Sequence, residues 1–150
     1  MKSRLLTLLV IIITTCASLA QGFKKMKVDH AAISVVDLKK SGDFYKKIIG
    51  LDSIDEPFKD GKHLWFSMGN GVQLHIISGA PKAKEYYQYN HICLGTDNVV
   101  AFTKLLDSKK IPWVDTKGVL NKITTRPDGV QQIWVKDPDG YWIEVNSANK

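Results

Sequence analysis

The sequence of 150 residues contains the same order of structural signals twice. In each half a histidine opens an alternating apolar segment, an aspartate follows, and an amphipathic segment containing a phenylalanine comes next. The matched residues are 61 positions apart for His30 and His91, 60 for Asp37 and Asp97, and 58 for Phe44 and Phe102. Two units are too few and too long for a solenoid, so the repeat predicts one domain built from two similar halves.

The first half predicts a strand, a helix and a hairpin. Residues 28–35 alternate with period two, and His30 lies on the less apolar face of that predicted strand. Apolar residues recur at helical spacing over residues 38–49, which predicts a helix. Two strand-like runs, residues 64–68 and 72–78, are separated by an Asn-Gly pair, which is a strong hairpin signal.

A short strand near residues 51–54 completes the first half, and the second half repeats the order. Residues 90–95 predict a strand, residues 99–108 a helix, and residues 130–136 and 141–146 a second hairpin. This order favours the α+β class, with curved mixed sheets and helices on one face of them.

The first twenty residues have the order of a secretory signal peptide. Lys2 and Arg4 precede an apolar run over residues 8–13, and small residues follow up to Ala20. The apolar run is shorter than the about 20 residues that a membrane-spanning helix needs. We therefore expect cleavage after Ala20, a leader over residues 21–27 and a secreted or periplasmic protein without a stable membrane anchor; retention as an anchor is the alternative.

The charge of the chain does not predict nucleic-acid binding. The sequence has 21 Lys and Arg against 15 Asp and Glu, a formal net charge of +6. The lysines are dispersed and are not interleaved with aromatic residues at a recognisable spacing, as a nucleic-acid surface would require. The sequence also contains no Gly-rich phosphate loop, nucleophile elbow or paired-cysteine zinc motif.

Four side chains that can bind a metal occupy matching places in the two halves. His30 and His91 open the first strand of each half, while His75 and Glu144 lie in the last strand of each half. Related positions in two similar halves are expected to converge near a pseudo-twofold axis. Three imidazoles and a carboxylate suit one divalent ion such as zinc, nickel, cobalt, manganese or iron. His63 lies in a polar stretch and is expected on the surface.

Four further residues are predicted to contact a substrate: Phe66, Gln73, Trp142 and Arg126. A two-residue hairpin loop would place Phe66 opposite His75, as an apolar wall, with Gln73 on the same face. Trp142 alternates onto the face of the carboxylate in the last strand. Arg126 lies in a long basic loop, where residues that bind an anionic substrate are often found.

Four stretches, residues 30–38, 42–51, 90–97 and 137–145, resemble the vicinal-oxygen-chelate superfamily. This group includes glyoxalase I, fosfomycin-resistance thiol transferases, methylmalonyl-CoA epimerase, extradiol dioxygenases and bleomycin-resistance proteins. The most specific stretch is the Asp-Pro-Asp-Gly turn before Glu144. The resemblance implies one domain over residues 28–147, with βαβββ modules over 28–80 and 90–147. The modules would form a cupped mixed sheet with helices on its outer face, often at the interface of a dimer.

By the same resemblance, His30, His75, His91 and Glu144 fall on the four metal-facing positions of the family. The metal would stabilise an enolate or oxyanion on a substrate with two neighbouring oxygen atoms. Glyoxalase-like members have a carboxylate where this chain has His75. If His75 binds the metal, Glu144 is the remaining candidate for proton transfer. If the other three residues bind it, His75 is the acid or base.

The function expected from this resemblance is an exported, divalent-metal-dependent lyase or isomerase similar to glyoxalase I, with a small-molecule substrate; a homodimer is compatible with it. One alternative is an Fe(II) ring-cleaving dioxygenase, because two histidines and one carboxylate are its donor set. The usual dioxygenases of this group have two additional modules, which this chain lacks. Another alternative is a metal-free drug-binding protein, a class that has no use for four metal-binding residues.

Overall fold

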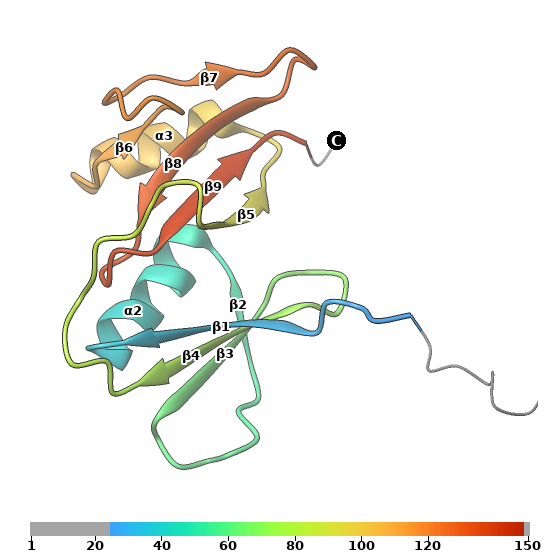
Figure 1. The fold of residues 1–150 in the computed structure, drawn as a ribbon, viewed down its shortest axis with the longest axis vertical. Helices are drawn as coiled ribbons and strands as arrows, with labels where there is room; N and C mark the ends of the chain where they lie inside the picture. The colour runs from blue at the N-terminus through green and yellow to red at the C-terminus, as the bar shows by residue number, and fades with distance from the viewer. Residues whose placement is uncertain (1–24, 149–150) are drawn as a thin grey trace, which may run out of the picture.

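The structure, a computed structural model, describes residues 25–148 as two sheets, each with its own helices (Figure 1). The first half consists of β1 (His30–Val35), α2 (Leu38–Phe44), the π-helix η2 (Tyr45–Ile49), β2 (Asp52–Ile54), β3 (His63–Ser67) and β4 (Gln73–Ser78). The second half consists of β5 (His91–Gly95), α3 (Val99–Ser108), β6 (Trp113–Val114), β7 (Thr124–Thr125), β8 (Gln131–Lys136) and β9 (Trp142–Asn146).

The two sheets have equivalent strand orders, β1-β4-β3-β2 and β5-β9-β8-β6, and β7 pairs with β8 at the side of the second sheet. In each sheet the first strand runs parallel to the last, and the other pairs are antiparallel. The predicted α+β class is confirmed. The predicted signal peptide lies outside the described residues, and within residues 25–148 no helix has the length and apolar character to cross a membrane.

Both helices begin at side-chain caps that follow the first strand of each half. The Asp37 carboxylate accepts a hydrogen bond from the Lys40 N–H at 2.9 Å, and the Asn98 side chain accepts one from the Ala101 N–H at 2.8 Å. These contacts satisfy N–H groups that have no partner within the helix. The second helix matches its prediction at residues 99–108.

The first helix differs from its prediction in its second half. The chain is α-helical only to Phe44 and then forms the π-helix from Tyr45 to Ile49, which ends at Gly50 with φ of 87°. The wider turns of the π-helix begin at Tyr45. This residue is buried, and its hydroxyl donates a hydrogen bond to Asp137 in the second half of the chain. Hydrophobic periodicity cannot separate the two helix types over so few residues, because their spacings differ by less than one residue per turn.

The turn between β8 and β9 joins the two halves. In Figure 1 this turn lies beside α2. The Tyr45 hydroxyl donates to Asp137 Oδ2 at 2.9 Å, while the Ser41 hydroxyl and the Val36 N–H donate to the two carboxylate oxygens of Asp139 at 2.6 and 2.7 Å. Both carboxylates are buried. Burial raises the pKa of Asp137, although hydrogen bonds from the Tyr141 N–H and Tyr45 oppose that shift.

Asp139→Ala is expected to lower the free energy of unfolding by about 2 kcal/mol, because it leaves the buried hydroxyl of Ser41 without an acceptor and also removes the acceptor of the Val36 N–H. Denaturant unfolding followed by circular dichroism measures the change. Asp55→Ala is the matched control, because Asp55 is exposed, and it should change the stability by less than about 0.5 kcal/mol. Equal effects of the two substitutions would contradict a role of Asp139 in joining the halves.

The register of the β3–β4 hairpin is one residue away from the prediction. Its loop contains three residues in the left-handed region, Gly69, Asn70 and Gly71, rather than two. Trp65 is therefore the residue opposite His75. Side chains alternate between the faces of a strand, so this shift moves each β3 residue to the other face relative to β4.

Phe66 consequently lies in the hydrophobic core and not at the predicted substrate site. It pairs with Leu74 across the strands, packs near Tyr45 with ring centroids 6.4 Å apart, and is 2% exposed. The predicted contact of Phe66 with a substrate is therefore wrong.

Candidate functional site

A histidine cluster lies on the face of the first sheet that is directed away from the core. His75 of β4 is surrounded by Trp65 and His63 of β3 and by His30 of β1, with ring centroids 4.1, 4.9 and 5.9 Å away. Phe58, from the loop before β3, stacks on His63 with centroids 4.5 Å apart. These five residues form a continuous aromatic surface, which we call the histidine cluster.

His63 belongs to this cluster and is not the surface residue that the sequence predicted. Its side chain is 17% exposed, and its Nδ1 lies 2.6 Å from Nε2 of His75. The polar residues before His63 suggested a loop, but β3 begins at His63 itself. Extending the period-two pattern back from Trp65 would have placed His63 on the same face as Trp65.

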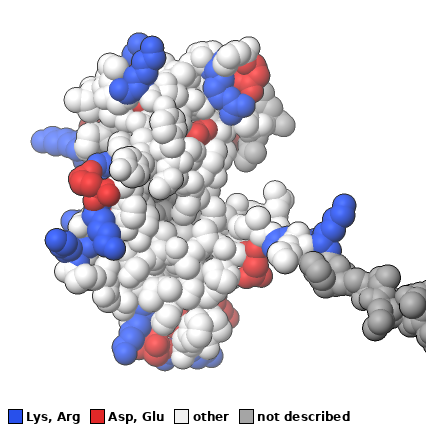
Figure 2. Space-filling model, viewed as in Figure 1, with Lys and Arg blue, Asp and Glu red and all other residues white. Residues whose placement is uncertain are grey.

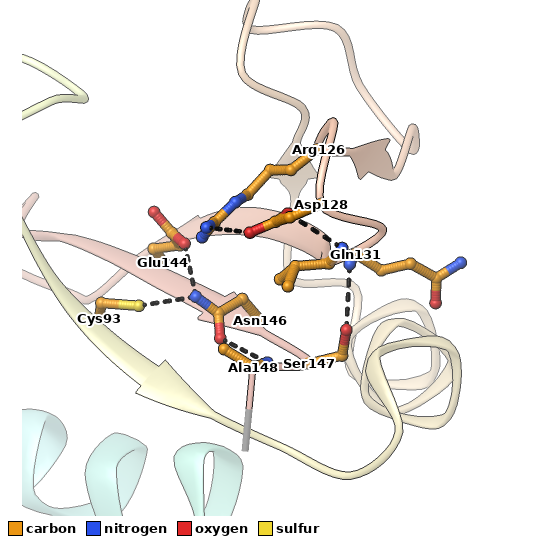
Figure 3. A network of polar contacts seen from close by, with 9 residues as sticks. Cys93, Arg126, Asp128, Gln131, Glu144, Asn146, Ser147 and Ala148 are labelled. Carbon is orange, nitrogen blue, oxygen red and sulfur yellow. Dashed lines mark hydrogen bonds and ion pairs between the residues drawn. The ribbon is translucent and has the colours of Figure 1, made fainter. Parts of the chain in front are cut away.

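The second sheet carries a histidine and a carboxylate in contact. Nε2 of His91 on β5 lies 3.1 Å from Oε2 of Glu144 on β9. The other carboxylate oxygen of Glu144 accepts a hydrogen bond from Asn146 Nδ2 at 2.8 Å (Figure 3). Asn146 also lies 3.1 Å from Cys93 Sγ. Burial, followed by the charge of Glu144, raises the pKa of the Cys93 thiol to about 12, so it is protonated at neutral pH.

Two of the four predicted ligands are oriented in the way that metal-binding histidines usually are. Nδ1 of His30 lies 2.6 Å from Asp29 Oδ2, and Nδ1 of His91 donates to the Gln88 carbonyl at 3.0 Å. Each contact leaves Nε2 for a ligand. Metal-binding histidines commonly donate their second ring N–H to a carboxylate or a backbone carbonyl, which fixes the ring and its tautomer.

His75 is neutral at pH 7. Burial lowers its pKa from the ordinary value, and the neighbouring His63 and His30 lower it further. A neutral imidazole offers a lone pair that can bind a metal or accept a proton.

Equivalent tryptophans stand beside the candidate ligands of the two halves. Trp65 is opposite His75 in the first sheet, and Trp134 is opposite Glu144 in the second. Among residues 25–148, their Nε1 atoms are the buried side-chain polar atoms that lack a hydrogen-bond partner. A buried donor without a partner is uncommon in proteins, so both halves hold an unused donor next to a candidate ligand.

The other predicted substrate-binding residues lie near these groups, with varied exposure. Gln73 is opposite His30 across β1 and β4 and is half-buried. Trp142 is opposite His91 across β5 and β9, and its Nε1 donates to the Tyr86 carbonyl at 2.9 Å. Figure 3 shows the Arg126 side chain extending from its loop toward Glu144, and its guanidinium pairs with Asp128 at 2.6 Å.

A single chain holds these groups as two separate half-sites. The first half-site contains His30 and His75, and the second contains His91 and Glu144. In the described part of the chain, no group of three or more His, Cys, Asp or Glu side chains is placed to hold a metal ion. The expectation that all four side chains converge is therefore not met by the described residues of one chain.

The strands β1 and β5, which carry His30 and His91, have exposed residues on one face and an unpaired edge. Three residues of β1, His30, Ala32 and Ser34, and two of β5, Cys93 and Gly95, are exposed. Within the described residues, β1 and β5 are also the terminal strands of their sheets, so one edge of each is unpaired. Such edges are available for contact with another chain.

The surface charge is dispersed. Figure 2 shows lysine and arginine side chains spread over the visible face, several of them next to acidic residues, and a largely uncharged hollow between the upper and lower lobes. Lys39 and Lys47 both pair with Asp43, and Lys136 pairs with Glu85. This face carries no continuous basic stripe of the kind that binds nucleic acid.

The comparisons with known proteins agree with the fold. The family model of the Glyoxalase/Bleomycin resistance protein/Dioxygenase superfamily matches residues 27–145. The uncharacterized protein YwbC of Bacillus subtilis is 28% identical over 124 residues, which are 79% of this chain and 94% of the relative. A lactoylglutathione lyase of Pseudomonas putida is 24% identical over 151 residues, covering 78% and 82% of the two chains.

Among solved structures, the genomically encoded fosfomycin resistance protein FosX of Listeria monocytogenes superposes with a TM-score of 0.64 at 19% identity. The match covers 84% of this chain and 96% of FosX. At this identity the likeness concerns the fold alone. Because the family model spans most of the sequence and both repeated modules, the chain belongs to the Glyoxalase/Bleomycin resistance protein/Dioxygenase superfamily.

Proposed function

We propose that this protein is a divalent-metal-dependent lyase or isomerase of the glyoxalase type that acts on a small molecule with two neighbouring oxygen atoms. The observation that carries the proposal is the orientation of the candidate ligands. His30 and His91 each have one ring nitrogen held by a protein acceptor, and Nε2 of His91 is already next to Glu144. The similarity to a lactoylglutathione lyase supports the same reaction class.

We further propose that the site is completed by a second copy of the chain. His30 and His75 of one protomer would meet His91 and Glu144 of its partner, and the symmetry of the dimer would create two such sites. The separation of the half-sites within one chain and the open edges of β1 and β5 support this arrangement.

The donor set fits a first-row divalent metal, because imidazole nitrogen and carboxylate oxygen are its usual ligands. When bound, such an ion supplies a positive charge that stabilises a developing oxyanion or enolate. His30, His91 and Glu144 would hold it. The unused indole N–H groups of Trp65 and Trp134 suit a ligand that carries oxygen atoms.

The chain offers two groups for moving a proton to or from the substrate carbon. His75 is neutral at pH 7 and can accept a proton if it does not bind the metal. Trp65, stacked on His75 at 4.1 Å between ring centroids, covers one face of the imidazole and keeps water away from it. If His75 is a fourth ligand, Glu144 is the remaining proton acceptor.

The metal content of the protein tests this function. Protein purified without chelator and supplemented with zinc, nickel, cobalt, manganese or iron is expected to retain about one ion per chain, measured by plasma mass spectrometry. Glu144→Gln should lose that ion. Glu85→Gln is the matched control, because Glu85 is exposed and lies outside the half-sites, and it should retain the metal.

The same measurement distinguishes the proposed enzyme from two alternative functions found in this superfamily, a small-molecule-binding protein and a dioxygenase. Wild-type protein that binds no metal after supplementation would overturn the proposed enzyme and favour a small-molecule-binding protein that uses the aromatic surface of the histidine cluster. Retention of iron together with oxygen uptake on catechols would favour a dioxygenase. A His75→Ala variant that keeps its metal but loses turnover would identify His75 as the proton acceptor.

We also propose that the protein is exported. The positively charged, apolar and small-residue order of residues 1–20 supports this proposal. Mass spectrometry of the protein recovered from the expressing cells should find a chain that begins at Gln21. A mature chain that retains residue 1 would contradict cleavage at this position.

A further inference from the structure

A groove lies at the junction of the two halves, between α2 and η2 on one side and the β8–β9 turn on the other (Figure 1). Its volume is about 420 Å³, within the range of small-molecule sites in proteins. Its lining residues, all in the described part of the chain, include none of the candidate metal ligands. We propose that this groove binds a small amphipathic carboxylate, an apolar chain that ends in one negative charge, such as a medium-chain fatty acid.

The floor of the groove is apolar and is built from both halves. Phe44 of α2 and Ile48 of η2 come from the first half, and Ile111 and Pro138 come from the second. Phe44 is buried, whereas the other three residues are half-buried and still expose apolar surface to solvent. An apolar chain lying on this floor would remove that surface from water, which stabilises the bound state.

Three lysines at the edge of the groove determine the charge of the ligand. Lys40, Lys47 and Lys136 all line it. Lys47 shares the carboxylate of Asp43 with Lys39, at 2.9 and 2.6 Å, so one carboxylate faces two ammonium groups. Among residues 25–148, no acidic side chain lies within ion-pair distance of the Lys40 ammonium group. An anionic head group beside Lys40 would therefore meet positive charge that the protein does not itself neutralise.

The remaining charged groups favour a ligand with a single negative charge. Lys136 pairs with Glu85 at 2.7 Å, but the Glu85 side chain is 88% exposed, and such a surface pair contributes little stability and can be exchanged. The buried carboxylate of Asp137 also lines the groove, and it accepts hydrogen bonds from the Tyr45 hydroxyl and from two backbone N–H groups. Its negative charge would repel a dianion more strongly than a monoanion.

A ligand in this groove would contact both halves at once. Its apolar chain would lie against η2 and the β8–β9 turn, so it would bind the packed halves and not the unfolded chain. Preferential binding to the folded protein raises the melting temperature as the ligand concentration rises. The proposal does not depend on the proposed function, because it uses none of the half-site residues.

Nuclear magnetic resonance of the full chain, labelled with nitrogen-15 and freed of metal by a chelator, tests the groove with octanoate as the probe. We expect saturable shifts of the backbone amides of Ile48 and Ile111, with a Kd of about 1 mM or tighter. Decanoate should bind more tightly, by up to about fourfold for each added methylene. Octan-1-ol, which lacks the charge, should bind about fivefold more weakly than octanoate.

A change of charge at the edge of the groove supplies the matched variants. Lys40→Glu should weaken octanoate binding by at least about fivefold, because it replaces the unpaired positive charge with a negative one. The substitution suits the helix, since acidic residues are favoured in a first helical turn. Lys104→Glu makes the same change at an exposed position of α3 that does not line the groove, and it should leave the affinity unchanged.

Several results would overturn the proposal. They are the absence of a saturable shift up to about 10 mM octanoate, binding of octan-1-ol as tight as that of octanoate, and equal effects of the two lysine variants. Shifts confined to the histidine cluster would also overturn it, because they would place octanoate at a half-site. A protein that binds octanoate in the groove but no metal keeps the groove and loses the proposed function, whereas one that binds metal but no octanoate loses only the groove.

Discussion

Two variants that each lose the metal are expected to recover it when they are combined in one dimer. His30→Ala removes a ligand from the first half-site, and Glu144→Ala removes one from the second. Each homodimer should bind metal at least about 100-fold more weakly than the wild type. In a heterodimer of the two variants, one site has lost both residues and the other is intact. The purified heterodimer should therefore hold about one ion.

Two different affinity tags on the variant chains allow the heterodimer to be isolated, and mass spectrometry of the native complex counts its ions. A heterodimer carrying Glu85→Gln on one chain and no change on the other is the control, and it should hold about two ions. If the metal were bound within a single chain, every site of the variant heterodimer would lack a ligand. A heterodimer as empty as the two homodimers would therefore contradict a shared site.

Phe66→Ala is expected to lower the free energy of unfolding by about 3–5 kcal/mol, because it leaves a cavity in the core beside Leu74 and Tyr45. Denaturant unfolding measures the loss. Phe58→Ala is the matched control, because Phe58 is 56% exposed, and it should cost less than about 1 kcal/mol.

The same experiment distinguishes the observed hairpin register from the one that a two-residue loop would give. With a two-residue loop, Phe66 would lie on the face of His75, and its removal would affect the site more than the core. A small loss of stability together with a change in metal or ligand binding would therefore support the two-residue loop and contradict the observed pairing.

Much of the fold is predictable because the repeat is visible in residue types. His30 and His91, sixty-one positions apart, open β1 and β5. The helix over residues 99–108 has its cap at Asn98 and buried residues at helical spacing, among them Val99 and Leu106. Strand alternation and helical periodicity depend on local geometry, which a sequence pattern records directly.

The features that could not be predicted depend on a single residue of register or on the packing of the two sheets. Gly69 adopts a left-handed backbone conformation, as Asn70 and Gly71 do, so the loop is one residue longer than predicted. As a result Trp65, and not Phe66, lies opposite His75. The separation of His75 from His91 depends on how the two halves pack against each other. A period-two pattern contains no information about that packing. A pattern places residues on a face but does not orient one sheet relative to another.

The contacts that join the two halves are not symmetric, although the two sheets repeat the same strand order. The second half supplies the carboxylates of Asp137 and Asp139, and the first half supplies the hydroxyl groups of Ser41 and Tyr45. The corresponding turn of the first half, residues 69–71, contains no carboxylate. The two halves therefore share a strand order, but neither half could replace the other at this junction. A chain made of two first halves would lack the acceptors, so the order of the modules is encoded at their junction.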